Sequence, residues 1–280
     1  MAEIFSYTFF QYALIAVVFI SVSSAIIGTY IVTRRMTAIA GGITHACFGG
    51  LGLGYYFGIN PIAMATVFAI ASSAGVEWLS SRQRIREDSA IAAVWAVGMA
   101  VGVMFVFLTP GLVPDLNSFL FGNILTITFS DLMAFAAFTI VLILFFALFF
   151  DKIVAVAFDK DFAKVSGMPV KFISTVMTVM IAVCIVLTIR LIGIMLLMSM
   201  LSLPQMIAEI RYHNFRGIMF CSIAVSLVAC VVSLFLAAIV DIPCSPIIVI
   251  ILTLVYIVAK AAQSVAERRK NNKLNTSRVK

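Results

Sequence analysis

Long apolar segments alternate with short polar ones along almost the whole chain. A helix needs roughly 18 or more apolar residues to cross a bilayer, and in lipid its backbone must satisfy its own hydrogen bonds. The pattern therefore predicts an all-α, polytopic membrane helix bundle with about nine transmembrane helices (eight to nine). The predicted spans are residues 9–32, 37–57, 61–80, 90–108, 131–150, 172–189, 191–208, 217–239 and 246–261.

The count is open between residues 172 and 208, where Arg190 and Pro204 interrupt the apolar run. A charge is costly in lipid, and a proline frees a backbone carbonyl inside a helix. The segment is read either as two short spans broken at Arg190 or as one span followed by a re-entrant piece.

Composition agrees with a membrane protein, because 63% of the residues are hydrophobic and the mean hydropathy is +1.17. Soluble domains are only about half apolar. We expect one permease domain over residues 1–262 and a basic cytoplasmic tail over 263–280. No removable signal peptide is expected, because no basic segment precedes the first span. The five cysteines fall mostly in apolar runs and indicate buried thiols rather than disulfides.

Basic residues predict the orientation, since Lys and Arg of short loops favour the cytoplasmic side. With the N-terminus outside and the C-terminus inside, all of the 19 basic residues except Arg190 lie on the inner side. The net charge of +7 therefore needs no nucleic-acid partner, and the tail is expected to be attracted to anionic membrane lipid.

Residues 151–171 carry seven charges between two apolar runs. They end in Ser166-Gly167-Met168-Pro169, a helix stop followed by a helix restart. The pattern predicts a short cytoplasmic helix at about 157–168. Phe162 and Val165 are three residues apart and would share one face, so this helix is expected to dock a soluble partner.

Two intramembrane clusters are candidates for a substrate path, because polar groups in lipid are costly. The second span carries Thr44 and His45 among glycines; His45 is read as a metal ligand or gate, or as a core histidine. Near Pro204, Ser199, Ser202 and Gln205 recur every third residue and are expected to share a face, which lines a pathway or a helix contact.

The small-residue pairs Gly50/Gly54 and Gly98/Gly102 predict close helix contacts. The chain has no P-loop, so it does not bind ATP by that motif, and no HExxH, which argues against a membrane metalloprotease. An intramembrane enzyme would also need a paired nucleophile and base, and none is evident.

Five segments in order resemble the permease of ATP-binding-cassette importers for zinc, manganese or iron. They are Ile43-Thr44-His45-Ala46, Asp115–Leu125, Asp159–Pro169, Gly193–Pro204, and Asp241-Ile242-Pro243 with Ile247-Ile248-Val249. Together they span most of residues 30–255. Four positions depart from the family: Gly41 stands where manganese-type members have an aspartate, Gln205 and Met206 replace alanines, and Ser245 replaces a glycine. These departures leave the metal open.

The resemblance implies a homodimeric permease around a central path in a prokaryotic plasma (inner) membrane. Its partners would be cytoplasmic ATP-binding subunits, which carry the ATP, and an extracytoplasmic metal-binding protein; the chain itself would bind no cofactor. Metal would pass Thr44 and His45, with His45 as a transient ligand, and Ser199, Ser202 and Gln205 are further pathway candidates. The ATPase-coupling residues would be Asp159, Asp161, Phe162, Ala163, Val165 and Gly167.

Alternative functions remain at this point. A permease for cobalamin or an iron–siderophore would share the architecture, and an ion-coupled secondary transporter would work without an ATPase.

Overall fold

The computed structural model describes residues 7–82, 85–110, 127–240 and 242–278. All regular structure within these ranges is helical, which confirms the all-α prediction. The helices are α1 (Thr8–Thr33), α2 (Thr37–Phe57), α3 (Pro61–Arg82), α4 (Glu87–Leu108), α6 (Phe129–Phe158), α7 (Lys160–Val165), α8 (Val170–Met200), α9 (Leu203–Glu209), α10 (Phe215–Val240) and α11 (Cys244–Arg278). The segment Asp115–Leu125 and residue Asp241, both used in the family resemblance, lie outside the described residues.

Seven helical stretches in the described part are long and apolar enough to cross a membrane. One of them, Val170–Glu209, covers both spans predicted at 172–189 and 191–208. The predicted break at Arg190 is misplaced: α8 is helical through Arg190, is interrupted three residues later at Gly193, and ends at Met200. The short α9 follows.

The helix α8 is interrupted at Gly193, whose φ of 78° and ψ of 172° are not helical. Positive φ is costly for residues with a Cβ, so the break falls at a residue that tolerates it. The hydroxyl of Ser245 in α11 donates to the carbonyl oxygen of Ile192 at 3.2 Å, beside this break. Ser245, one of the departures from the family pattern, thus bonds to the backbone where α8 changes direction.

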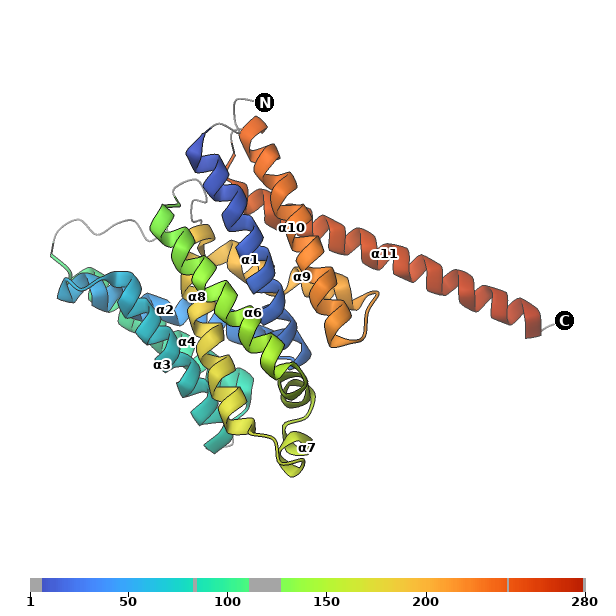
Figure 1. Cartoon of the computed structure of the whole chain (residues 1–280), viewed down its shortest axis with the longest axis horizontal. Coiled ribbons are helices and arrows are strands. Elements are labelled where there is room, and N and C mark those ends of the chain that lie inside the picture. The colour runs from blue at the N-terminus through green and yellow to red at the C-terminus, as the bar shows by residue number, and fades with distance from the viewer. Residues whose placement is uncertain (1–6, 83–84, 111–126, 241, 279–280) are drawn as a thin grey trace.

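Aromatic contacts show which helix ends lie together. The ring of Phe10, at the start of α1, is 5.7 Å from that of Phe235, near the end of α10. At the opposite end, Phe150 of α6 is 5.8 Å from Phe215, the first residue of α10. The start of α1 therefore lies at one end of the bundle and α7 at the other (Figure 1). We call the latter the α7 end.

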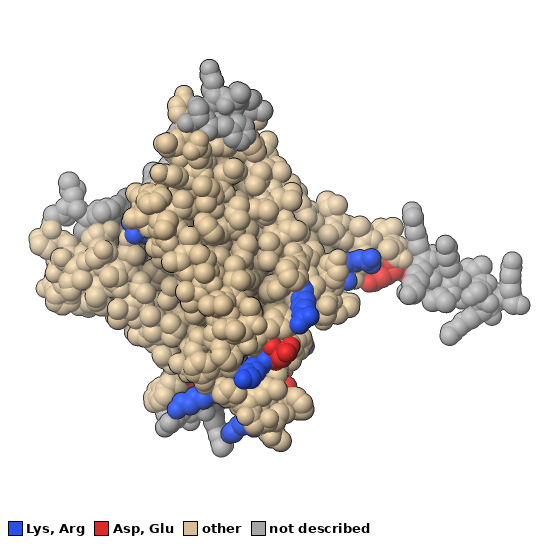
Figure 2. All heavy atoms as spheres, in the orientation of Figure 1, with Lys and Arg blue, Asp and Glu red and all other residues tan. Residues whose placement is uncertain are grey.

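Charged residues from distant parts of the chain meet at the α7 end. Arg34 of α1 and Thr178 of α8 line one pocket there, and the Thr178 hydroxyl donates to Glu77 of α3 at 3.2 Å. The guanidinium carbon of Arg216 lies 4.6 Å from the ring centre of Phe150. Figure 2 shows most charges of the visible face along this edge and on α11, beside a broad surface of uncharged residues. Such a surface is typical of a protein that meets lipid.

The helix α2 is the most enclosed part of the bundle, although it is not among the seven apolar stretches. A side-chain carbon at Gly52 would overlap the backbone of Gly102 in α4, and one at Gly50 would lie 2.5 Å from the carbonyl oxygen of Met64 in α3. Backbones therefore touch directly on two sides of α2. This confirms the predicted close contacts of small residues.

The last helix, α11, contacts α8, α9 and α10 near its start and then leaves the bundle (Figure 1). It continues to Arg278 and so includes most of the residues predicted as a tail.

Candidate functional site

His45 lies near the middle of α2, on its most exposed flank. Its ring stacks on Trp95 of α4, with centroids 4.6 Å apart and planes at 6°, and more loosely on Phe48 at 6.5 Å. Its Nδ1 atom is buried and has no hydrogen-bond partner in the described structure. A buried imidazole nitrogen normally has a partner, so Nδ1 keeps an unused bonding capacity, although protein atoms cover it in this structure.

Trp95 was not predicted as a site residue. It is 42% exposed and holds the imidazole plane parallel to its own ring, which fixes how His45 is presented. The sequence alone gave little reason to select Trp95, because a tryptophan in an apolar span stands out only when its neighbour on another helix is known.

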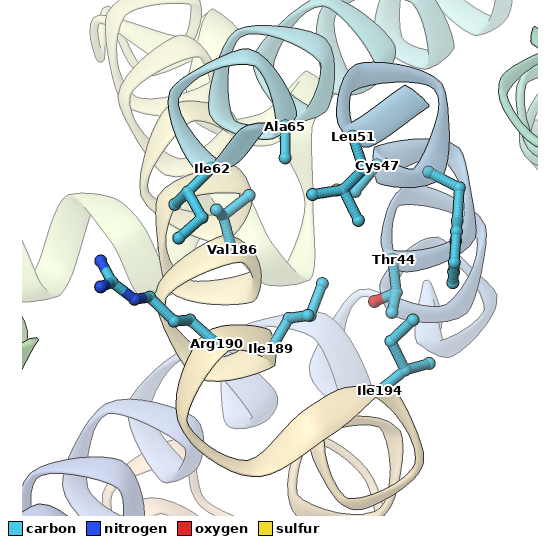
Figure 3. A pocket seen from close by; sticks show the side chains of 10 residues that line it. Thr44, Cys47, Leu51, Ile62, Ala65, Val186, Ile189, Arg190 and Ile194 are labelled. Carbon is cyan, nitrogen blue, oxygen red and sulfur yellow. The ribbon is translucent and has the colours of Figure 1, made fainter. Parts of the chain in front are cut away.

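Thr44 points to a different space from His45. It lines a narrow pocket between α2, α3 and α8 that encloses about 340 Å³ outside protein atoms, part of it open (Figure 3). The Thr44 hydroxyl donates to the carbonyl oxygen of Ala40 in its own helix. Apart from Thr44 and Arg190, the lining is apolar, and Figure 3 shows the Arg190 guanidinium directed away from the pocket. This pocket therefore offers few ligand atoms to a cation.

Ser199 and Ser202 are partly exposed, and each hydroxyl donates into the turn before it. Ser199 bonds to the carbonyl of Met195 at 3.2 Å, and Ser202 bonds to that of Met198 at 2.8 Å. Their oxygen lone pairs remain free to accept a hydrogen bond or to face a cation.

Gln205 does not share this face. It is fully buried, and its amide nitrogen donates to the carbonyl of Ser24 in α1 at 3.2 Å. The regular three-residue spacing did not put the three residues together, because α8 ends at Met200 and Gln205 belongs to α9. A carbon at Gly28 would overlap the Gln205 amide, so this side chain packs α9 on α1.

Arg190, the one basic residue outside the predicted inner group, has a carboxylate partner. Its guanidinium nitrogen lies 2.8 Å from an oxygen of Asp131, a buried residue in the first turn of α6. The other Asp131 oxygen accepts from the Thr128 hydroxyl at 2.7 Å. It also accepts from the Thr128 backbone N–H, a bond that belongs to the capping box at the start of α6. The pair joins α8 to the start of α6, three residues before the break at Gly193. Pairing reduces the cost of the charge in the membrane.

The helix α7 lies on the predicted coupling segment. The Asp159 side chain caps it by accepting from the N–H groups of Asp161 at 3.0 Å and Phe162 at 2.9 Å. Gly167, with φ 73°, ends it. Ala163 is fully buried, whereas Phe162 and Val165 are 62% and 89% exposed. Two apolar side chains thus face outward at the charged end of the bundle.

A bundle of helices this long and apolar defines an integral membrane protein. The chain belongs to the ABC 3 transport family, which matches residues 6–263. It is a multi-pass plasma-membrane permease of that family.

Relatives from several bacteria are similar over most of their length. The chain is 30% identical over 262 residues to the chelated iron transport system membrane protein YfeD of Yersinia pestis, covering 92% of this chain and 87% of that one. It is 27% identical over 253 residues to the manganese transport system membrane protein MntC of Listeria monocytogenes, covering 90% of each. Its fold is similar to that of PsaBC from Streptococcus pneumoniae, solved with a Fab, with a TM-score of 0.80, 24% identity, and coverage of 92% of this chain and 93% of that one.

Proposed function

We propose that this chain is the transmembrane permease subunit of an ATP-driven importer for divalent metal ions. The observation that carries the proposal is α7 within a chain of the ABC 3 family. An exposed apolar pair on a short capped helix at the charged end is suited to receive force from a soluble subunit. Relatives whose names specify manganese or chelated iron transport support the substrate class.

In this proposal two copies of the chain face each other around a central path. Two cytoplasmic ATP-binding subunits hold α7, and an extracytoplasmic protein delivers the metal. ATP binding closes the ATPase pair and moves α7, and because α7 is joined to α6 and α8, the motion reaches both helices. ATP stays on the partner, and this chain holds no cofactor.

The proposal includes an orientation of the chain in the membrane, based on where the charged residues lie. The α7 end gathers residues from α1, α3, α8 and α10, and basic residues favour the cytoplasm. We place this end inside and the N-terminus outside.

His45 is the proposed transient metal contact. It stacks on an exposed tryptophan and has a free buried nitrogen, but its described neighbours are aromatic and apolar rather than further carboxylates. A single imidazole holds a divalent ion weakly, and weak binding suits a path from which cargo must leave quickly.

The test is uptake by proteoliposomes that contain the permease with its ATP-binding subunit, with metal supplied by the binding protein. We expect ATP-dependent accumulation of a radioactive divalent metal, abolished when the ATPase cannot hydrolyse ATP. Metal uptake that is equal without the ATPase would favour an ion-coupled carrier. Uptake of cobalamin or a ferric siderophore, with no uptake of the bare metal, would favour the permease for chelates.

A further inference from the structure

A pocket at the α7 end lies between α7, the start of α8 and α3. It encloses about 1380 Å³ outside protein atoms, part of it open. Its lining includes three lysines, Lys160 and Lys164 of α7 and Lys171 of α8, and one acidic residue, Glu77 of α3. Three positive charges against one negative charge around a hollow favour an anionic ligand.

The other residues of this lining are of two kinds. Two carry hydroxyl groups and four are apolar: Ser174 and Thr175, and Met168, Pro169, Val170 and Phe172. Phe172 is 51% exposed, so a large apolar surface lies beside the charged groups. A ligand that joins an anionic group to a hydrocarbon chain would match both kinds of residue.

The hydroxyl of Ser174 independently indicates a ligand. This residue is only 4% exposed, and its Oγ atom has no hydrogen-bond partner in the described structure. A buried hydroxyl normally has one. Protein atoms cover Oγ in this structure, but rotation about the Cα–Cβ bond moves it between staggered positions. The pocket therefore has a hydroxyl donor in its wall that no described group uses.

The start of α8 adds to the attraction for an anion. This helix begins at Val170, and its N-cap residue, Pro169, has no side-chain oxygen to accept from the first turn. The first backbone N–H groups of a helix lack intrahelical partners and carry a partial positive charge. Both residues line the pocket, so that charge lies at its edge.

The pocket uses a different face of α7 from the exposed apolar pair. Lys160 and Lys164 are four residues apart and share one face. Phe162 and Val165 lie about 120–180° around the helix from that face. A ligand between the lysines and α8 would therefore leave Phe162 and Val165 uncovered.

We propose that this pocket binds the phosphate headgroup of an anionic phospholipid such as phosphatidylglycerol. The lipid, rather than a soluble phosphate, is favoured because apolar residues share the lining and α8 is long and apolar enough to span the membrane. Basic pockets beside membrane helices are suited to such headgroups. The inference goes beyond metal import, since it requires only that the α7 end lie at a membrane surface.

The experiment titrates the purified full-length permease in detergent with phosphatidylglycerol or phosphatidylcholine and counts bound lipid by native mass spectrometry. We expect tighter binding of phosphatidylglycerol by the wild type. Lys164→Gln combined with Lys171→Gln should weaken that binding at least about tenfold, because two charges leave the pocket. Ser174→Ala should weaken it about threefold or more, because the phosphate loses a donor.

The matched control is Lys152→Gln combined with Lys260→Gln. It removes the same charge from two lysines outside the lining of the pocket, one on α6 and one on α11, and should leave the affinity unchanged. Inorganic phosphate should displace the lipid poorly, because it has no hydrocarbon chain. The pocket variants should still co-purify with the ATP-binding subunit.

An unchanged affinity in either pocket variant would overturn the inference, as would equal binding of the two lipids by the wild type. An equal loss in the control pair would mean general attraction to basic residues rather than a site. Ready displacement by inorganic phosphate would indicate a site for a soluble anion. Loss of the ATP-binding subunit from the lysine variant would assign the lysines to a protein contact instead.

Discussion

At the scale of single residues, the polar groups inside the bundle have two different roles. The Asp131–Arg190 pair is structural, because it joins two helices and neutralises a charge. Gln205 is also structural, since it is buried between α9 and α1. His45 differs from both, because no described side chain or backbone group bonds to its ring, whereas Gln205 is held by its amide nitrogen even though its amide oxygen has no described partner. A polar residue in lipid is therefore a functional candidate only after its partners are known.

We predict that His45→Ala lowers the rate of metal uptake at least about tenfold, because the path loses its nitrogen donor. Purified permease should bind metal only weakly with or without the substitution, as measured by equilibrium dialysis. The control is Trp95→Phe, which keeps an aromatic surface beside the imidazole and should retain most of the uptake. Uptake at the wild-type rate in His45→Ala would mean that His45 only packs against Trp95, and would direct attention to Ser199 and Ser202.

At the scale of elements, α7 combines two properties. It is fixed to the bundle by its buried Ala163 and its connections to α6 and α8, and it exposes two large apolar side chains. In a solvated loop such side chains would be replaced by polar ones at little cost. Their presence is explained if a partner covers them.

The prediction for this element is loss of coupling. Replacing Phe162 and Val165 together with Asp should abolish metal uptake and the binding of the ATP-binding subunit, because two charges would face an apolar surface. The permease should still reach the membrane, since both side chains are exposed. Co-purification with the ATPase measures binding, and Lys164→Gln, which changes a polar neighbour, serves as the control. Normal ATPase binding by the double variant would contradict the assignment.

Apolar runs predicted most helices, and the Ser166-Gly167 stop predicted α7, because both signals are local. The failure at residues 172–208 has a clear cause. Arg190 looks like a break only while Asp131 is unknown, and this partner belongs to another helix. The site was predicted in part: His45 was recognised by its type, but Trp95 could be found only after α4 had been placed against α2.

At the scale of the molecule, the packing explains why the basic residues matter together. Arg34 after α1, Glu77 of α3 and Arg216 of α10 all lie toward the α7 end, although these segments are far apart in sequence. The same end carries the element proposed to meet the ATPase. The proposed orientation and the proposed contact with the ATPase therefore both require the α7 end to be cytoplasmic.

Single cysteines in a cysteine-free background test this orientation. Ile59→Cys should react with a membrane-impermeant thiol reagent added outside intact cells, because it follows α2 at the end opposite α7. Ser89→Cys, Ser166→Cys and Ser264→Cys should react only after the membrane is opened. The variants must first be shown to transport metal. Outside labelling of Ser166→Cys would reverse the whole arrangement.

The enclosure of α2 has a consequence for how the protein is made. Backbone atoms of α3 and α4 approach its glycines so closely that neighbouring helices, rather than lipid, surround most of it. Glycine adds little to the hydrophobicity by which a translocon admits a helix. We therefore expect α2 to settle in the bilayer together with α3 and α4 rather than before them.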